Sequence, residues 1–205
     1  MKFTYNGADV CEMSAEQEKC IQYDIPSSIF NADMKRRAVW VVQNLFNKSL
    51  LFMKRKLASQ WAEMGVSELP PTDAELAQLI VSKVAPANSY QDSVLAVDGV
   101  DLYTVSALTK QLIDVGTARN ADDLIAKGIA GIFAEKLKMC CKRLRAHYEP
   151  MMKAEKKSIP VSEDAFMKQA LARPDYQDRE TRDEMDAAEK KSLVDKANNL
   201  LSGML

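Results

Sequence analysis

Glycine and proline are scarce in this chain, with seven of each among 205 residues. Proline interrupts the hydrogen bonds of a helix interior, and glycine costs about 1 kcal/mol there relative to alanine, so both residues mark where regular elements stop. Their scarcity favours long helices over a sheet protein with many turns. Because the chain is 47% hydrophobic and 28% charged, it can bury a core and is not disordered as a whole.

The chain also lacks an excess of either charge and any long apolar run. Its 28 basic and 29 acidic residues give a net charge of −1, which provides no overall field to attract nucleic acid or an anionic membrane. The start, MKFTYNGADV, lacks the basic and then apolar pattern of a signal peptide. No apolar stretch approaches the roughly 18 residues that suggest a membrane span. We therefore expect a soluble protein without a membrane partner.

Motifs for catalysis, cofactors and metals are missing from the sequence. There is no GxGxxG and no Gly-x4-Gly-Lys-Ser/Thr to hold a phosphate, and a metal or Ser-His site would depend on the single histidine, His147. Acidic residues between 175 and 186 lack the spacing of a calcium loop and are interleaved with arginines. We interpret His147 as a surface or partly buried residue, and we predict no enzymatic activity, no cofactor and no metal.

The cysteines form no Cys-x-x-Cys pair; they are Cys11, Cys20, Cys140 and Cys141. Reduced thiols in a cytoplasm fit this spacing better than a disulfide framework. Adjacent residues on a helix point about 100° apart, so Cys140 and Cys141 cannot easily share a face. We predict that Cys140 lies in the core and Cys141 at the core boundary, both as packing residues.

A local pattern occurs twice and predicts two β-hairpins. Asn-Gly at 6–7 and Asp-Gly at 98–99 favour two-residue hairpin turns, because both turn positions need a positive φ. A serine follows each hairpin, Ser14 in the first case and Ser106 in the second, and serine can cap the start of a helix. We therefore expect a short helix after each hairpin.

The strongest internal match lies in two segments that we expect to be long helices, residues 35–64 and 123–152. Apolar residues recur at steps of three and four in the second segment, which places them on one helical stripe. The segments align without a gap, and the aligned pairs include Leu57 with Leu144 and Trp61 with Tyr148. We interpret Trp61 and Tyr148 as core anchors rather than as a base-stacking pair.

After each long helix an apolar residue and a proline, at 69–70 and at 159–160, lead into a short helix that Thr72 or Ser162 can cap. We therefore predict a mainly α fold with short β-hairpins, built from two tandem repeats of a hairpin–helix–long helix–short helix unit. The predicted parts are a first repeat unit at 1–93, a second repeat unit at 94–178, and a charged helix with an apolar tail at 179–205.

Basic clusters recur at matching positions of the two long helices and are candidates for partner binding, together with leucines of the tail. These residues are Lys54, Arg55, Lys56, Lys142, Arg143, Arg145, Leu193, Leu200 and Leu201. Two basic patches could straddle a nucleic-acid backbone, but lysine and arginine are also good helix formers that coat exposed faces. The near-neutral total charge disfavours nucleic acid, so we expect protein partners.

Several short motifs together carry a resemblance. They are Thr4–Gly7, Lys142–Leu144, Ile159-Pro160, Asp164–Phe166 and Arg173–Arg179. In this order they are similar to a group of small, uncharacterised proteins of tailed bacteriophages and prophages. Members of that group usually hold a single unit, whereas the pattern is doubled in this chain. The resemblance implies other phage proteins as partners, and it implies no enzymatic activity.

From the resemblance and the repeat we expect a bacteriophage virion structural or assembly protein that acts as a helical adaptor through protein–protein contacts. It would occur in the host cytoplasm or within the virion, and homo-oligomerisation stays open. The alternative is a phage-encoded regulator or host-defence inhibitor that binds protein or nucleic acid. A structural part would be present in purified particles in fixed copy number, whereas an early regulator would not.

Overall fold

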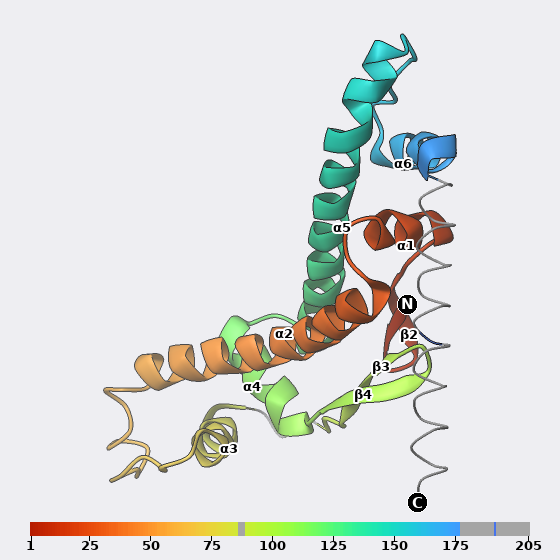
Figure 1. Cartoon of the computed structure of the whole chain (residues 1–205). Coiled ribbons are helices and arrows are strands. Elements are labelled where there is room, and N and C mark those ends of the chain that lie inside the picture. Colours follow the sequence, from red (N-terminus) through yellow and green to blue (C-terminus); the bar gives the residue numbers. More distant parts are fainter. Residues whose placement is uncertain (86–88, 177–190, 192–205) are drawn as a thin grey trace, which may run out of the picture. The chain divides into compact units, whose positions relative to one another are not determined.

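The computed structural model describes residues 1–85, 89–176 and 191 (Figure 1). This part of the chain is mainly helical and has two β-hairpins, each followed by helices, which confirms the predicted fold class. The elements are β1 (Lys2–Tyr5), β2 (Ala8–Glu12), α1 (Ala15–Gln22), α2 (Ser27–Lys56), α3 (Asp73–Val84), β3 (Ser93–Val97), β4 (Val100–Val105), α4 (Ala107–Thr117), α5 (Ala121–Ala154) and α6 (Glu163–Leu171). None of the helices among these residues is long and apolar enough to cross a membrane.

The two hairpins form one four-stranded antiparallel sheet in the order β2-β1-β3-β4. Each hairpin closes with its predicted turn, because the residues at 6–7 and at 98–99 all have positive φ values, between 50° and 78°. Both hairpins shift register at matching positions, after Phe3 and after Leu95. Phe3 of β1 lies opposite Val97 of β3, so the inner strands join the two repeats.

The short helix after each hairpin packs against helices of the other repeat. In chain order, α1, α2 and α3 of the first repeat correspond to α4, α5 and α6 of the second. α4 packs on α2 and α3, while α1 packs on α6. The short helix of each repeat is therefore exchanged, as in a domain-swapped dimer whose two chains have become one.

Contacts divide the chain into two compact units. The first consists of Met1–Ser14 and Ile25–Met139, and therefore of the sheet, α2, α3, α4 and the first part of α5. A cluster of buried side chains joins its helices: Leu50, Met53, Leu57, Trp61, Leu76, Ala77, Ile80 and Leu112. Burying one large apolar side chain contributes about 1.5–3 kcal/mol, so this cluster stabilises the packing of α4 on α2 and α3.

The second compact unit consists of Ala15–Asp24 and the described residues from Cys140 onward, and therefore contains α1, the end of α5, and α6. Tyr148 is buried in this unit, as Trp61 is in the first, which confirms that both are core anchors. The Tyr176 hydroxyl donates a 2.9 Å hydrogen bond to the backbone carbonyl of Lys19. The repeat boundaries at 93 and 178 stay a prediction, because the compact units divide the chain along other lines.

Cys141 is buried, so its predicted place at the core boundary is wrong, whereas Cys140 is buried as predicted. The reason is that α1 and α6 both reach Cys141: its sulfur lies 3.7 Å from that of Cys20 and 3.2 Å from that of Met167. The hydrogen bond with Cys141 and burial raise the pKa of the Cys20 thiol far above its usual range. The cysteines are free thiols.

The first long helix begins and ends earlier than predicted. α2 ends at Lys56 and turns occupy residues 57–64, although we predicted helix throughout 35–64. Gly65 after these residues has a left-handed φ of 75°, a conformation that glycine adopts readily. Met152 at the matching position of the second repeat stays within α5, and α5 confirms the predicted helix at 123–152.

Side-chain caps fix where α3, α4 and α6 begin. Thr72 forms a capping box with Glu75 at the start of α3. Ser106 and Ser162 each accept a 3.2 Å hydrogen bond from the backbone amide three residues ahead, at the starts of α4 and α6. These three caps were predicted and are confirmed; a cap of this kind contributes about 1 kcal/mol.

Candidate functional site

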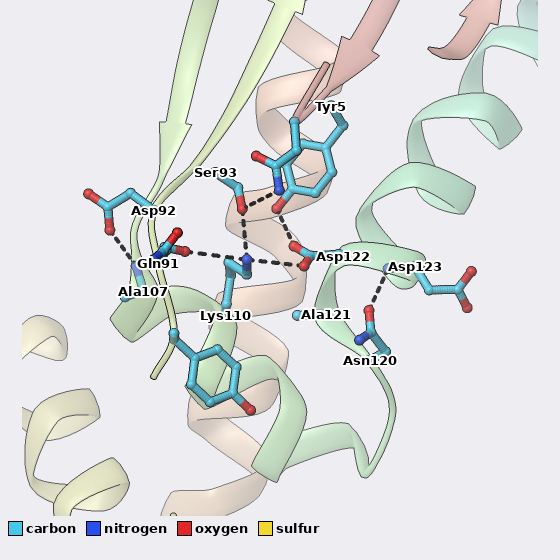
Figure 2. A network of polar contacts seen from close by, with 12 residues as sticks. Tyr5, Gln91, Asp92, Ser93, Ala107, Lys110, Asn120, Ala121, Asp122 and Asp123 are labelled. Carbon is cyan, nitrogen blue, oxygen red and sulfur yellow. Dashed lines mark hydrogen bonds and ion pairs between the residues drawn. The ribbon is translucent and has the colours of Figure 1, made fainter. Parts of the chain in front are cut away.

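Lys110 on α4 is the centre of a polar network in the first compact unit (Figure 2). Its ammonium group contacts the Ser93 hydroxyl at 2.7 Å, the Asp122 carboxylate at 3.0 Å and the Gln91 carbonyl at 3.3 Å. The side chain is 10% exposed, and a largely buried charge is stable only with such partners. An ammonium group has three donors, so these acceptors match its capacity.

Tyr5 of β1 joins this network from the sheet. Its hydroxyl donates a 2.7 Å hydrogen bond to one oxygen of Asp122, whose other oxygen contacts Lys110. Burial raises the pKa of Tyr5 well above its usual value, so the phenol stays protonated and remains a donor. The Asn6 amide donates to the Ser93 hydroxyl at 2.9 Å. The network thereby fastens β1 and β3 to α4 and to the first turn of α5.

A pocket of about 390 Å³ with a largely polar lining lies at this network. Its lining residues are Asn6, Ser89, Tyr90, Gln91, Asp92, Ser93, Lys110, Asp114, Asn120, Ala121 and Asp122. Asp114 accepts hydrogen bonds from the Tyr90 hydroxyl at 2.5 Å and from the Ala121 amide at 2.6 Å. The lining residues therefore form hydrogen bonds with one another, and these bonds hold the start of α5 in place.

Asp33 on α2 holds the place in the first repeat that Asp122 holds in the second, because each ends an Asn-Ala-Asp triplet. Its partners are cations: Arg36 at 2.8 Å, and Arg37 and Lys136 at 2.9 Å each. Hydrogen bonds from Arg36 and Lys136 lower the pKa of Asp33 far below its usual range. These four residues form what we call the Asp33 cluster, whose three positive charges and one negative charge leave a surplus of two positive charges.

A pocket of about 650 Å³ opens beside the Asp33 cluster. Its lining residues are Ile25, Ser28, Ile29, Phe30, Ala32, Asp33, Arg36 and Lys136. The side chain of Arg36 is 79% exposed and that of Lys136 is 22% exposed. Apolar side chains from the start of α2 thus lie next to two accessible cations, an arrangement that can hold an apolar group and an anion together.

One exposed stripe of α2 carries large apolar side chains. Ile29, Trp40 and Leu51 are 60%, 54% and 49% exposed. They are eleven residues apart, and eleven steps of about 100° return to within about 20° of the starting direction. Arg36 and Lys54 lie on the same stripe by the same geometry. These five residues are called the α2 face below.

Helix α2 is also strongly basic. Its basic residues are Lys35, Arg36, Arg37, Lys48, Lys54, Arg55 and Lys56, and its acidic residue is Asp33. Seven positive charges and one negative charge give this helix a net charge of +6, against −1 for the whole chain. The near-neutral total therefore conceals a positive local field, which acts over about 8–10 Å at moderate salt.

The basic residues predicted as partner-binding differ in their surroundings. Lys54, Arg55 and Lys56 are exposed in the last turn of α2, in the first compact unit. Lys142 and Arg143 are exposed on α5 in the second compact unit. The predicted tail residues Leu193, Leu200 and Leu201 lie outside the described residues.

Arg143 and Arg145 make contacts within the second compact unit. Arg143 forms an ion pair with Asp24. The guanidinium of Arg145 lies 4.1 Å from the centre of the Phe166 ring and donates a 3.2 Å hydrogen bond to the carbonyl of Pro160. Arg145 therefore has a packing role at α6, and its use for partner binding stays a prediction. His147 is exposed on α5, within its predicted range of environments.

Trp40 and the Asp33 cluster were not among the predicted site residues. The sequence contains a signal for Trp40, since Ile29, Trp40 and Leu51 recur at steps of eleven, but apolar residues at helical spacing usually indicate a core stripe. The contact between Asp33 and Lys136 joins α2 to α5, and no local pattern predicts which long helix approaches which.

Comparison with known proteins adds no relative: no protein-family model, no curated protein and no solved structure matches the chain. The resemblance to phage proteins therefore stays a prediction from short motifs. Among residues 1–85, 89–176 and 191, no group of three or more His, Cys, Asp or Glu side chains converges as metal ligands do. The α2 face and the Asp33 cluster are the features with the clearest capacity to bind a partner.

Proposed function

We propose that this protein is a helical adaptor that joins other proteins, as a structural or assembly component of a bacteriophage particle. The observation that carries the proposal is the α2 face. It presents Trp40, Ile29 and Leu51, each about half exposed, along one stripe of a 30-residue helix. Tryptophan is enriched among the residues that dominate protein–protein binding energy.

The composition of the α2 face indicates the kind of partner. Large apolar side chains gain most when they enter an apolar groove on another protein. Arg36 and Lys54 flank these side chains, and the helix has a net charge of +6 by the count given above. Charge complementarity therefore favours a protein groove with an acidic rim, which would also speed association. Phage proteins are the expected source of such a groove because of the resemblance described above.

The duplicated architecture supports an adaptor role. One chain contains two copies of an interaction-sized unit, and the copies differ at their long helices, since α2 has the exposed apolar stripe just described. Two different surfaces on one chain allow a single subunit to bridge two unlike neighbours, and the second contact then forms at a raised effective concentration. A particle offers repeated neighbours because its parts obey symmetry.

The test compares incorporation of variants into particles of the source phage. We expect the wild-type chain in purified particles at a fixed copy number, measured by quantitative mass spectrometry. Trp40→Glu and Leu51→Glu should each lower incorporation by about tenfold or more, because a buried interface anchor is worth about 2 kcal/mol. The matched control is Phe52→Glu, since Phe52 is 52% exposed on the same helix but points about 120° away from Trp40.

Circular dichroism would first establish that the three variants remain folded. If Phe52→Glu lowers incorporation into particles as much as Trp40→Glu does, the α2 face is not the binding surface. A protein that is abundant early in infection, yet missing from particles and from assembly intermediates, would overturn the adaptor role and favour the alternative, a phage-encoded regulator or host-defence inhibitor.

A further inference from the structure

We infer that the pocket at the Asp33 cluster is the part of the α2 face that receives an acidic side chain of the partner protein, together with an apolar neighbour of that side chain. This inference rests on the proposed function and names the chemistry of the partner. Arg36 and Lys136 would hold the carboxylate, and the adjacent apolar side chain would lie against Ile29, which is 60% exposed.

The charge balance of the cluster carries the inference. Asp33 contacts Arg36, Arg37 and Lys136 within 2.9 Å, so one carboxylate is shared by three cations. Arg36 reaches Asp33 through its Nη2 atom, and its side chain is 79% exposed. Nη2 carries two hydrogens, so the one that Asp33 does not take can act with a hydrogen of Nε or Nη1 to bind a second carboxylate, in the paired geometry that arginine favours.

The second repeat provides an internal comparison. Asp122, at the matching position, is balanced by the single cation Lys110 and by the neutral hydroxyl of Tyr5. That arrangement fastens α5 with no surplus charge and lies at a pocket of about 390 Å³. One cation is thus enough to hold this aspartate in the fold. Asp33 contacts two cations more than Asp122 does, and it lies next to the larger pocket of about 650 Å³. Binding of an anion in that pocket would explain the two additional positive charges.

The order of side chains along the α2 face indicates the shape of the partner segment. Ile29, Arg36 and Trp40 follow one another on the stripe. The partner must therefore present an apolar, an acidic and an apolar side chain in that order. Ile29 and Trp40 are separated by about 16 Å along the helix axis, at about 1.5 Å per residue. A helical segment of about eleven residues with an acidic residue between two apolar anchors fits this spacing.

The experiment uses the full chain and three synthetic helical peptides. Each peptide has two leucines eleven residues apart on one face, with Glu, Gln or Lys between them. Fluorescence anisotropy gives the affinities, and amide chemical shifts of the isotope-labelled protein locate the peptide. We expect the Glu peptide to bind about tenfold more tightly than the Gln peptide, because the Gln peptide cannot form the charge-assisted pair with Arg36 and Lys136. The shifts should centre on Ile29, Arg36 and Lys136.

Variants make the test specific. Arg36→Gln and Lys136→Gln should remove most of the preference for Glu over Gln, and Arg36→Glu should shift the preference toward the Lys peptide. Lys127→Gln is the matched control, because Lys127 is a 73% exposed cation on α5 that pairs with Asp123. Equal affinity for the Glu and Gln peptides, or an unchanged preference in both Gln variants, would overturn the inference.

Two further outcomes separate this inference from the proposed function. If particles exclude Trp40→Glu protein but incorporate Arg36→Gln protein at the wild-type level, the adaptor role stands and the acidic subsite is wrong. If a duplex oligonucleotide binds more tightly than the Glu peptide and loses affinity with Arg36→Gln, the cluster belongs to a nucleic-acid site, and both proposals fail.

Discussion

Gly116 and Ser49 show, at the scale of single residues, how closely α4 approaches α2. A Cβ atom added to Gly116 would lie 2.6 Å from Cβ of Ser49 and 2.9 Å from its Cα. The second neighbour is backbone and cannot rotate away. Ser49 is buried, and its hydroxyl is without a hydrogen-bond partner among the described residues. A small side chain at 49 and glycine at 116 thus allow the close crossing of the two helices.

Replacing Gly116 tests this crossing. Gly116→Ala should destabilise the protein by about 1–3 kcal/mol, because overpacking forces the helices apart. Gly131→Ala is the matched control: Gly131 lies inside α5 with nothing within 4 Å of an added Cβ, so it should stabilise by up to about 1 kcal/mol. Urea unfolding followed by circular dichroism measures both. A stabilising Gly116→Ala would show that the crossing is looser than described.

At the scale of elements, Tyr5 links β1 to α5, because its hydroxyl donates a 2.7 Å hydrogen bond to Asp122. Burial raises the pKa of Tyr5, so folding favours the neutral phenol over its usual ionisation near pH 10. The stabilisation that this group provides is therefore complete below about pH 10, and it is lost as the pH rises above that value.

Tyr5→Phe separates this link from the rest of the network. At pH 7 the variant should be about 1 kcal/mol less stable, which is the net value of a typical hydrogen bond. Its stability should fall less steeply than that of the wild type between about pH 9 and 11, because one raised phenol pKa has been removed. Tyr103→Phe is a control with a tyrosine from β4. Parallel pH profiles for wild type and Tyr5→Phe would contradict the assignment.

The exchange of the short helices and the sheet that both hairpins share govern the molecule as a whole. β1 pairs with β3 across the repeats, and α4 of the second repeat packs on α2 and α3 of the first. Each repeat therefore leaves apolar surface uncovered when the other is missing. A two-stranded hairpin is also only marginally stable by itself in water.

Dividing the chain shortly before the second hairpin should therefore give two fragments that need each other. Residues 1–88 and 89–205, purified separately and mixed, should form a one-to-one complex with more helix than the sum of the parts. Light scattering after size exclusion and circular dichroism measure these quantities. A chain divided within α2, between residues 40 and 41, serves as the control and should reassemble poorly. A cooperatively folded monomer of residues 1–88 would refute the exchange.

Local features of this protein were determined by the sequence itself. The turns at 6–7 and 98–99 depend on residues that tolerate a positive φ, and the caps at Thr72 and Ser162 depend on a side chain and an amide three residues away. The repeat was likewise readable, because both copies keep the same order of elements. Such features were predicted correctly since their free energy comes from neighbours along the chain.

Tertiary structure decided which elements meet. The pairing of β1 with β3 and the contact of Asp33 with Lys136 join residues about 90 to 100 positions apart, and α4 packs on α2 and α3 of the first repeat. The burial of Cys141 by α1 and α6 and the exposure of Trp40 were also decided by tertiary packing. The sequence alone determined that Trp40 lies on a helix, but not that this stripe faces solvent. Helical spacing is identical on a buried and an exposed stripe, and only the neighbouring helices determine which one is covered.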